Sequence, residues 1–91
     1  MENKKISVSV MALYEKFGEK LTHGRIRKTV DSDGEFYDLV VDGWKLATCD
    51  GEVNELISVE NGVYTFKNDE GDFGEVTFKL TQDEFNIACL V

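Results

Sequence analysis

Residues 33–62 have the sequence DGEFYDLVVDGWKLATCDGEVNELISVENG, and this stretch decides the fold class. Short apolar runs alternate in it with Asp-Gly and Asn-Gly pairs, at 33–34, 42–43, 50–51 and 61–62. These dipeptides tolerate the positive φ angles of tight hairpin turns. A Glu-Gly pair follows at 70–71, so the turns recur roughly every ten residues. The spacing predicts an antiparallel β-meander.

The meander should contain about five to six strands. We place them at about 25–30, 35–41, 44–49, 52–59, 63–67 and 73–80. Alternating apolar residues define one face of the sheet, and we expect that face to be buried. The apolar face comprises Tyr37, Leu39, Val41, Trp44, Leu46, Tyr64, Phe66, Val76, Phe78 and Leu80, and the opposite face Thr65, Glu75, Thr77 and Lys79.

The N-terminal third has a different periodicity. From 9 to about 22 the apolar residues fall on one face of a helix, namely Val10, Leu13, Tyr14, Phe17 and Leu21. Ser7 or Ser9 can cap the start of this helix, and Gly24 suits its end, with His23 as a residue of the last turn. Gly18 lies inside it as a weak point. Residues 6–10 also alternate as a strand would, and a short strand before the helix accommodates both patterns.

The C-terminal segment carries a helix-start signal. Residues 81–84, TQDE, match the capping box, in which a Thr hydroxyl and a Glu carboxylate each accept a free backbone N–H. We predict a short helix at about 82–89 with Phe85, Ala88 and Cys89 facing inward. A final strand over 86–91 is the alternative, because its apolar residues also alternate. The predicted fold class is α+β, with the N-terminal helix packed on the meander.

Length and composition indicate one domain spanning 1–91. The chain has 91 residues, of which 42% are hydrophobic, and no proline; one compact core needs most of those apolar side chains. The apolar runs are too short to cross a bilayer, and the N-terminus has no signal-peptide core, so we expect a cytoplasmic protein. Cys49 and Cys89 are expected to be reduced; a disulfide between them is the alternative in a secreted protein.

The charge is unevenly distributed. The formal net charge is −8. Residues 1–30 contain seven basic and three acidic side chains, whereas 31–91 contain fifteen acidic side chains and three lysines. A negative field repels phosphate backbones and anionic lipid headgroups, which argues against direct binding to nucleic acid or membranes. The same field attracts basic proteins. The alternative is that the acidic turns only keep the protein soluble.

Motifs for chemistry are missing. The acidic turns at 31–35 and 68–72 lack the glycine and glutamate positions of a calcium-binding EF-hand loop. His23 is the single histidine, so a histidine-based zinc site cannot be built. There is no Gly-rich phosphate loop and no nucleophile elbow. We therefore predict no enzyme activity, no metal and no cofactor, while a site assembled from distant residues stays an alternative.

Two smaller clusters have ordinary structural explanations. Arg25, Arg27 and Lys28, together with lysines at 4 and 5, form a basic cluster that lacks the interleaved aromatics of a single-strand-binding platform. Trp44 and Tyr37 flank the turn at 42–43, where a cross-strand contact is expected; an exposed anchor for a protein partner is the alternative.

The functional hypothesis is a small acidic protein-binding module. It would act as an inhibitor, immunity-type protein or nucleic-acid mimic that neutralises a basic, nucleic-acid-binding protein. The alternative is a structural or assembly protein that forms a homodimer through a sheet edge or its C-terminal segment. The candidate contact residues are acidic and lie at turns: Asp31, Asp33, Glu35, Asp50, Glu52, Asp69, Glu70 and Asp72.

Overall fold

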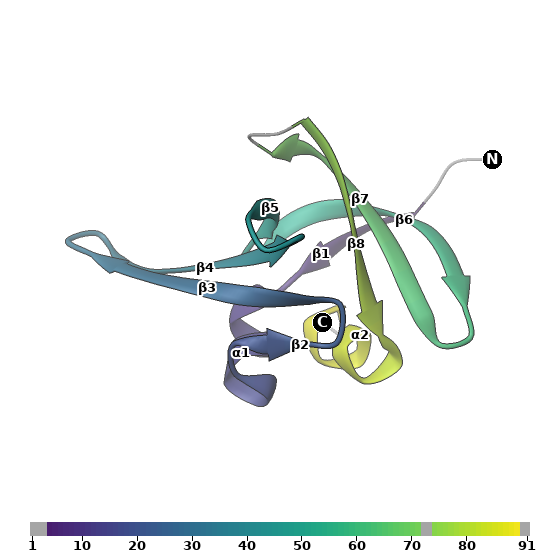
Figure 1. The fold of residues 1–91 in the computed structure, drawn as a ribbon, viewed down its shortest axis with the longest axis horizontal. Coiled ribbons are helices and arrows are strands. Elements are labelled where there is room, and N and C mark those ends of the chain that lie inside the picture. Colours follow the sequence, from purple (N-terminus) through teal and green to yellow (C-terminus); the bar gives the residue numbers. More distant parts are fainter. Residues whose placement is uncertain (1–3, 72–73, 90–91) are drawn as a thin grey trace.

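The computed structural model describes residues 4–71 and 74–89, and these form two antiparallel four-stranded sheets and two helices (Figure 1). One sheet contains, in spatial order, β1 (Lys4–Val8), β6 (Glu52–Glu60), β7 (Val63–Gly71) and β8 (Gly74–Thr81). The other contains β2 (Lys20–Leu21), β3 (Gly24–Asp31), β4 (Gly34–Val41) and β5 (Lys45–Cys49). The helices are α1 (Val10–Phe17) and α2 (Gln82–Cys89).

The α+β class is confirmed, but the single meander is wrong, because the chain changes sheets after β5. Gly51 adopts a φ of 76° and donates its N–H to the carbonyl of Val8 at 2.9 Å. β6 then pairs with β1 in a register that joins Val8 to Glu52. Residues 50 and 51 therefore connect the two sheets and do not form a hairpin turn. The strand that pairs with β6 is β1, which the alternation in residues 6–10 predicted.

The N-terminal helix is shorter than predicted. Ser9 caps it, since its hydroxyl accepts the N–H of Ala12 at 3.3 Å. Gly18 ends it with a φ of 79° and donates its N–H to the carbonyl of Tyr14 at 2.8 Å, a left-handed stop that glycine adopts without steric cost. Gly18 is thus the terminator, and Gly24 is the first residue of β3. His23 lies in the turn between β2 and β3, not in a helix.

The C-terminal helix has the predicted bounds and the predicted cap. The hydroxyl of Thr81 accepts the N–H of Glu84 at 3.3 Å, while the Glu84 carboxylate accepts the N–H of Thr81 at 2.9 Å. The other carboxylate oxygen of Glu84, which is 3% exposed as a residue, accepts the N–H of Thr22 at 3.1 Å. Residues 86–89 are helical, so the alternative of a final strand is wrong for this segment.

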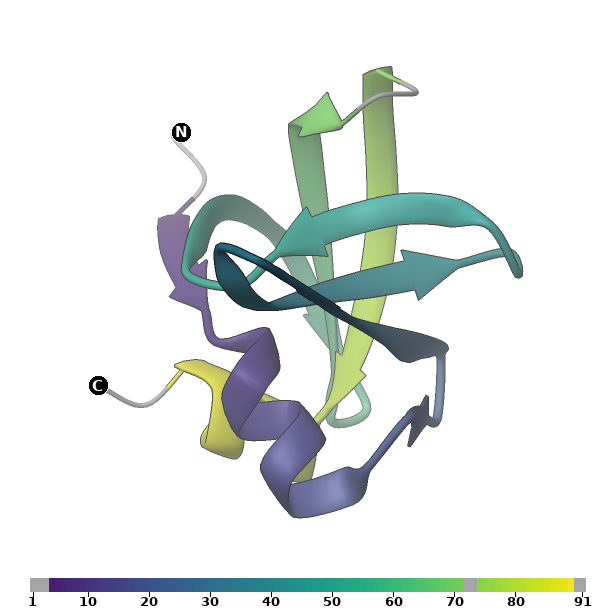
Figure 2. The same ribbon diagram turned by 90° about the vertical axis from the view of Figure 1, so that its left-hand side faces the viewer.

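The two helices lie side by side next to the strands (Figure 2). The sheets and the helices share one cluster of buried apolar side chains. Val10 and Leu13 enter it from α1, Leu80 enters it from β8, and the ring of Phe66 stacks on that of Phe78 with centroids 5.1 Å apart. The predicted apolar face is mostly buried. Trp44 is an exception: it is 60% exposed in the turn before β5, whereas Tyr37 is buried.

A buried polar chain ties the sheets together where β5, β6 and β7 meet. The side-chain amide of Asn54 donates to the hydroxyl of Thr48 at 3.0 Å, and that of Asn68 donates to the Asn54 oxygen at 2.7 Å. All three residues are at most 3% exposed. Because these groups hydrogen-bond to one another, their burial is tolerated. The bond between Asn54 and Thr48 also helps to fix the position of one sheet against the other.

Candidate protein-binding surface

The most distinctive surface is the hairpin of β3 and β4, which extends away from the rest of the molecule (Figure 1). β2 pairs with β3 only at Gly24 and Arg25, and β5 pairs with β4 only as far as Asp38. Within the described residues, the part between 27 and 37 is thus a ribbon of two strands, which we call the projecting hairpin. It contributes to an elongated shape with principal extents of 43, 27 and 25 Å.

The turn at the end of the projecting hairpin is held by its own side chain. Asp31 and Gly34 are the last paired residues, and the Asp31 carboxylate accepts the N–H of Asp33 at 2.8 Å. This short-range bond orders the acidic turn without help from the body of the protein. The carboxylates of Asp31 and Asp33 take part in no ion pair within the described residues, so the end of the hairpin keeps negative charge.

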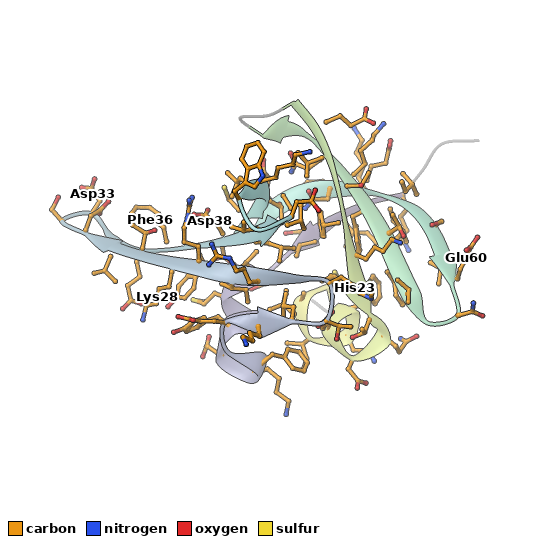
Figure 3. All side chains as sticks on the ribbon, viewed as in Figure 1. His23, Lys28, Asp33, Phe36, Asp38 and Glu60 are labelled. Atoms are coloured by element: carbon orange, nitrogen blue, oxygen red, sulfur yellow. The ribbon has the colours of Figure 1, made fainter. Side chains whose placement is uncertain are left out.

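Cross-strand ion pairs brace the ribbon on both faces. Lys28 Nζ lies 3.6 Å from Glu35 Oε1 on one face, and Arg27 Nη2 lies 3.2 Å from Asp38 Oδ2 on the other. Figure 3 shows this division, with the Phe36 and Asp38 side chains on one side of the ribbon and Lys28 on the other. Two basic residues of the N-terminal third therefore neutralise two acidic residues of the hairpin.

Aromatic rings support the base of the hairpin. Lys28 Nζ lies 5.6 Å from the ring centroid of Tyr14 in α1 and 5.8 Å from that of Tyr37. The Tyr37 hydroxyl donates to Glu35 Oε2 at 2.9 Å. The Glu35 carboxylate raises the pKa of Lys28 by its charge, and it raises the pKa of Tyr37 mainly by accepting that hydrogen bond. Both groups keep their protons at neutral pH, so Lys28 stays a cation and Tyr37 a neutral phenol.

Two apolar side chains are exposed near the end of the hairpin. Val30 is 66% exposed and Phe36 is 46% exposed. They lie on opposite faces, because Val30 pairs with Glu35 and Thr29 pairs with Phe36 in adjacent rungs. Each face of the hairpin therefore carries one exposed apolar side chain close to the acidic turn. Sequence reasoning missed both residues, because the alternation of apolar residues does not show that β3 and β4 extend beyond the ends of β2 and β5.

Three of the predicted acidic residues gather on this hairpin: Asp31, Asp33 and Glu35. Of these, Glu35 is engaged by Lys28 and Tyr37. Asp72 lies outside the described residues, and so do the side chains of Asp69 and Glu70.

Asp50 and Glu52 have internal hydrogen-bonding roles. Asp50 Oδ1 accepts the N–H of Met11 at 2.9 Å and the hydroxyl of Ser9 at 3.3 Å, at the start of α1. Glu52 Oε2 accepts the N–H of Cys49 at 2.9 Å and the hydroxyl of Thr48 at 3.2 Å. These carboxylates are not brought to the end of the projecting hairpin.

The basic cluster does not assemble as one patch. Arg27 and Lys28 form the ion pairs just described, and Arg25 donates to the carbonyl of Gly43 at 3.4 Å. Lys4 and Lys5 belong to β1 in the other sheet.

The two thiols are partly or fully buried, whereas His23 is exposed. Both cysteines are free, and burial raises the pKa of Cys49 to about 12 and that of Cys89 to about 11. Thiols of this kind are poor nucleophiles at neutral pH. His23 borders a hollow that Glu60 and Lys79 also line. In the part of the chain that the structure describes, no group of His, Cys, Asp and Glu could hold a metal ion.

Comparisons with protein-family models, with curated proteins and with solved structures found no match to this chain. Across residues 4–71 and 74–89, neither helix has the length and apolar character needed to cross a membrane.

Proposed function

We propose that this protein is a non-enzymatic binding module that presents the projecting hairpin to a basic protein. Binding would occlude the cationic surface of that partner, so the protein would act as an inhibitor of a nucleic-acid-binding protein. The observation that carries the proposal is the pairing of exposed Val30 and Phe36 with the acidic turn of Asp31 and Asp33, on a ribbon that extends beyond its sheet neighbours.

The charge distribution supports a basic partner. The net charge is −8, and the carboxylates of Asp31 and Asp33 are not neutralised by an ion pair within the described residues. Carboxylates at the end of a projection meet a partner first, and complementary charge raises the association rate. Apolar anchors then slow dissociation, because a few buried side chains carry most of the binding energy in protein interfaces.

The internal contacts of the hairpin also support the proposal. The cluster of Lys28, Glu35, Tyr37 and Tyr14 holds its base, and the Asp31 side chain holds its turn. A surface that is ordered before binding loses less conformational entropy when it binds. The hairpin therefore combines projection, charge and order in one element.

The test is affinity capture from the native cells with wild-type protein and three variants. We expect Asp33→Asn and Phe36→Ala to reduce recovery of a basic partner, and recovery by wild type to fall steeply as salt concentration rises. Glu60→Gln is the matched control, because Glu60 is exposed at the end of β6, at the opposite end of the molecule (Figure 3). It should leave recovery unchanged.

Equal recovery by all three variants would contradict the assignment of the hairpin, and a partner whose binding ignores salt would contradict the basic target. The alternative function, a homodimer that acts in assembly, predicts a concentration-dependent dimer in light scattering and no heterologous partner. Recovery of a salt-sensitive basic partner by a monomer would exclude that alternative.

A further inference from the structure

The edge of β4 that faces β5, here called the outer edge, has a hydrogen-bonded neighbour at Tyr37 but no neighbouring strand at Glu35, within the described residues. The carbonyl of Tyr37 accepts the N–H of Asp50 at 3.0 Å, which is the last bond of β4 toward the β5 side. Gly51 then turns into the other sheet. No described strand covers β4 between Gly34 and Phe36 on this side.

The direction of the open backbone groups follows from the ladder. In an antiparallel pair, the N–H and C=O of alternate residues point to the same edge. Because the Tyr37 carbonyl points toward Asp50, the N–H and C=O of Glu35 point toward the same outer edge. The N–H of Glu35 is therefore a donor and its C=O an acceptor, next to the bond between Tyr37 and Asp50. A strand that continued the direction of β5 would pair with these two groups.

A hollow of about 230 Å³ lies along this edge. It is lined by Glu35, Phe36, Tyr37, Asp38, Cys49 and Asp50. These residues come from two segments, β4 and the end of β5 with the turn after it. The hollow is thus bounded by the open strand edge on one side and by the departing chain on the other.

The lining combines carboxylates with aromatic rings, Phe36 on one face of β4 and Tyr37 on the other. Asp38 forms an ion pair with Arg27, and Glu35 forms one with Lys28. One oxygen of Asp50 accepts hydrogen bonds from a backbone N–H and a hydroxyl at the start of α1. A carboxylate accepts several hydrogen bonds, so a further cation can share these oxygens. The half-exposed Phe36 ring can cover the aliphatic part of a long basic side chain.

We propose that an extended segment of the partner adds to the edge of β4 at Glu35 and places a lysine or arginine side chain in this hollow. The inference rests on the proposed function, because it assumes a basic protein partner. Strand addition supplies backbone hydrogen bonds, and the hollow selects the side chain. Arginine suits it best, since its planar group donates two parallel hydrogen bonds to one carboxylate.

A second copy of this chain fits the edge poorly. A symmetric dimer pairs the same edge of both copies, which would bring Glu35 of one near Glu35 of the other. Like charges directly opposite in a sheet are destabilising. The acidic turn with Asp33 would add to the repulsion, so the edge favours a cationic partner over self-association.

The experiment titrates the ¹⁵N-labelled protein with a blocked pentapeptide of alternating valine and arginine. We expect amide shifts to concentrate at Glu35, Phe36 and Asp50, exchange of the Glu35 amide to slow, and affinity to fall as salt rises. The same peptide with glutamate in place of arginine should produce no shifts. Phe36→Ala should raise Kd about fivefold. Val59→Ser, an exposed position on β6 outside the hollow and the hairpin, should leave Kd unchanged.

Shifts centred on another strand edge, equal shifts with both peptides, or no shifts with either would overturn the inference. The proposed function would survive that result if hairpin variants still lose the native partner in affinity capture. Conversely, arginine-dependent shifts at Glu35 together with failure to recover any basic protein would support the edge site and contradict the proposed function. The two proposals therefore fail separately.

Discussion

Replacing Asp50 with alanine should destabilise the protein, because Asp50 caps α1 from outside the helix. Its carboxylate accepts the N–H of Met11 at 2.9 Å and the hydroxyl of Ser9 at 3.3 Å. Loss of a capping side chain typically costs about 1 kcal/mol, and loss of a negative charge at a helix start costs about 0.3–1 kcal/mol more. We expect the free energy of unfolding to fall by about 1–2 kcal/mol.

Urea unfolding followed by circular dichroism measures this change. The midpoint should move to lower urea while the slope stays the same, because the variant exposes the same surface on unfolding. The matched control is Asp33→Ala, the same chemical change at the end of the projecting hairpin. Its stability should lie within about 0.5 kcal/mol of wild type, as is usual for exposed positions.

Equal stability of Asp50→Ala and wild type would refute the reasoning. It would mean that the carboxylate of Asp50 contributes nothing to α1 and is available to a partner, as the sequence-based hypothesis assumed. A loss with Asp33→Ala as large as with Asp50→Ala would equally refute the division between structural and surface acids.

Three further predictions follow from buried groups. Asn54→Ala should lower the free energy of unfolding by about 2–4 kcal/mol in urea titrations, because its hydrogen-bond partners stay buried without it. Glu84→Gln should speed hydrogen exchange of the Thr22 amide measured by NMR, because an amide oxygen accepts more weakly than a carboxylate. The raised pKa values of Cys49 and Cys89, about 12 and about 11 against an ordinary 9.0, mean that the unfolded chain loses these protons first. Stability should therefore fall as pH rises above about 9, in urea titrations at a series of pH values.

Local features were predictable from the sequence because they depend on neighbouring residues. Glu84 and Thr81 form the predicted capping box, and Ser9 caps α1 as expected. The strand positions follow the Asp-Gly and Asn-Gly pairs closely; at Asn61 and Gly62 both φ angles are positive, at 53° and 78°, as the Asn-Gly pair implies. The turn predicted at the Glu-Gly pair 70–71 is wrong, because both residues belong to β7. Gly18 shows the limit of this logic, since a glycine inside an amphipathic pattern can interrupt a helix or end it, and the pattern does not decide which.

The candidate site was only partly predictable. The acidic turn at Asp31 and Asp33 was identified because charge and turn position are visible in the sequence. Asp50 and Glu52 were assigned to the same surface for the same reason, yet their carboxylates bond to backbone and hydroxyl groups. Phe36 was missed, since its exposure depends on where β5 ends.

The sequence by itself determined the approximate positions of β3 to β8 and how both helices begin, because dihedral preferences and short-range hydrogen bonds act over a few residues. It placed residues 20 and 21 in the first helix, whereas they form β2. Only the tertiary structure decided which strand edges pair. After Cys49 the next strand pairs with β1 rather than with β5, a choice between edges far apart in sequence that depends on burying one shared core. That choice leaves β4 uncovered beyond Tyr37 among the described residues, and so creates the projecting hairpin on which the proposed function rests.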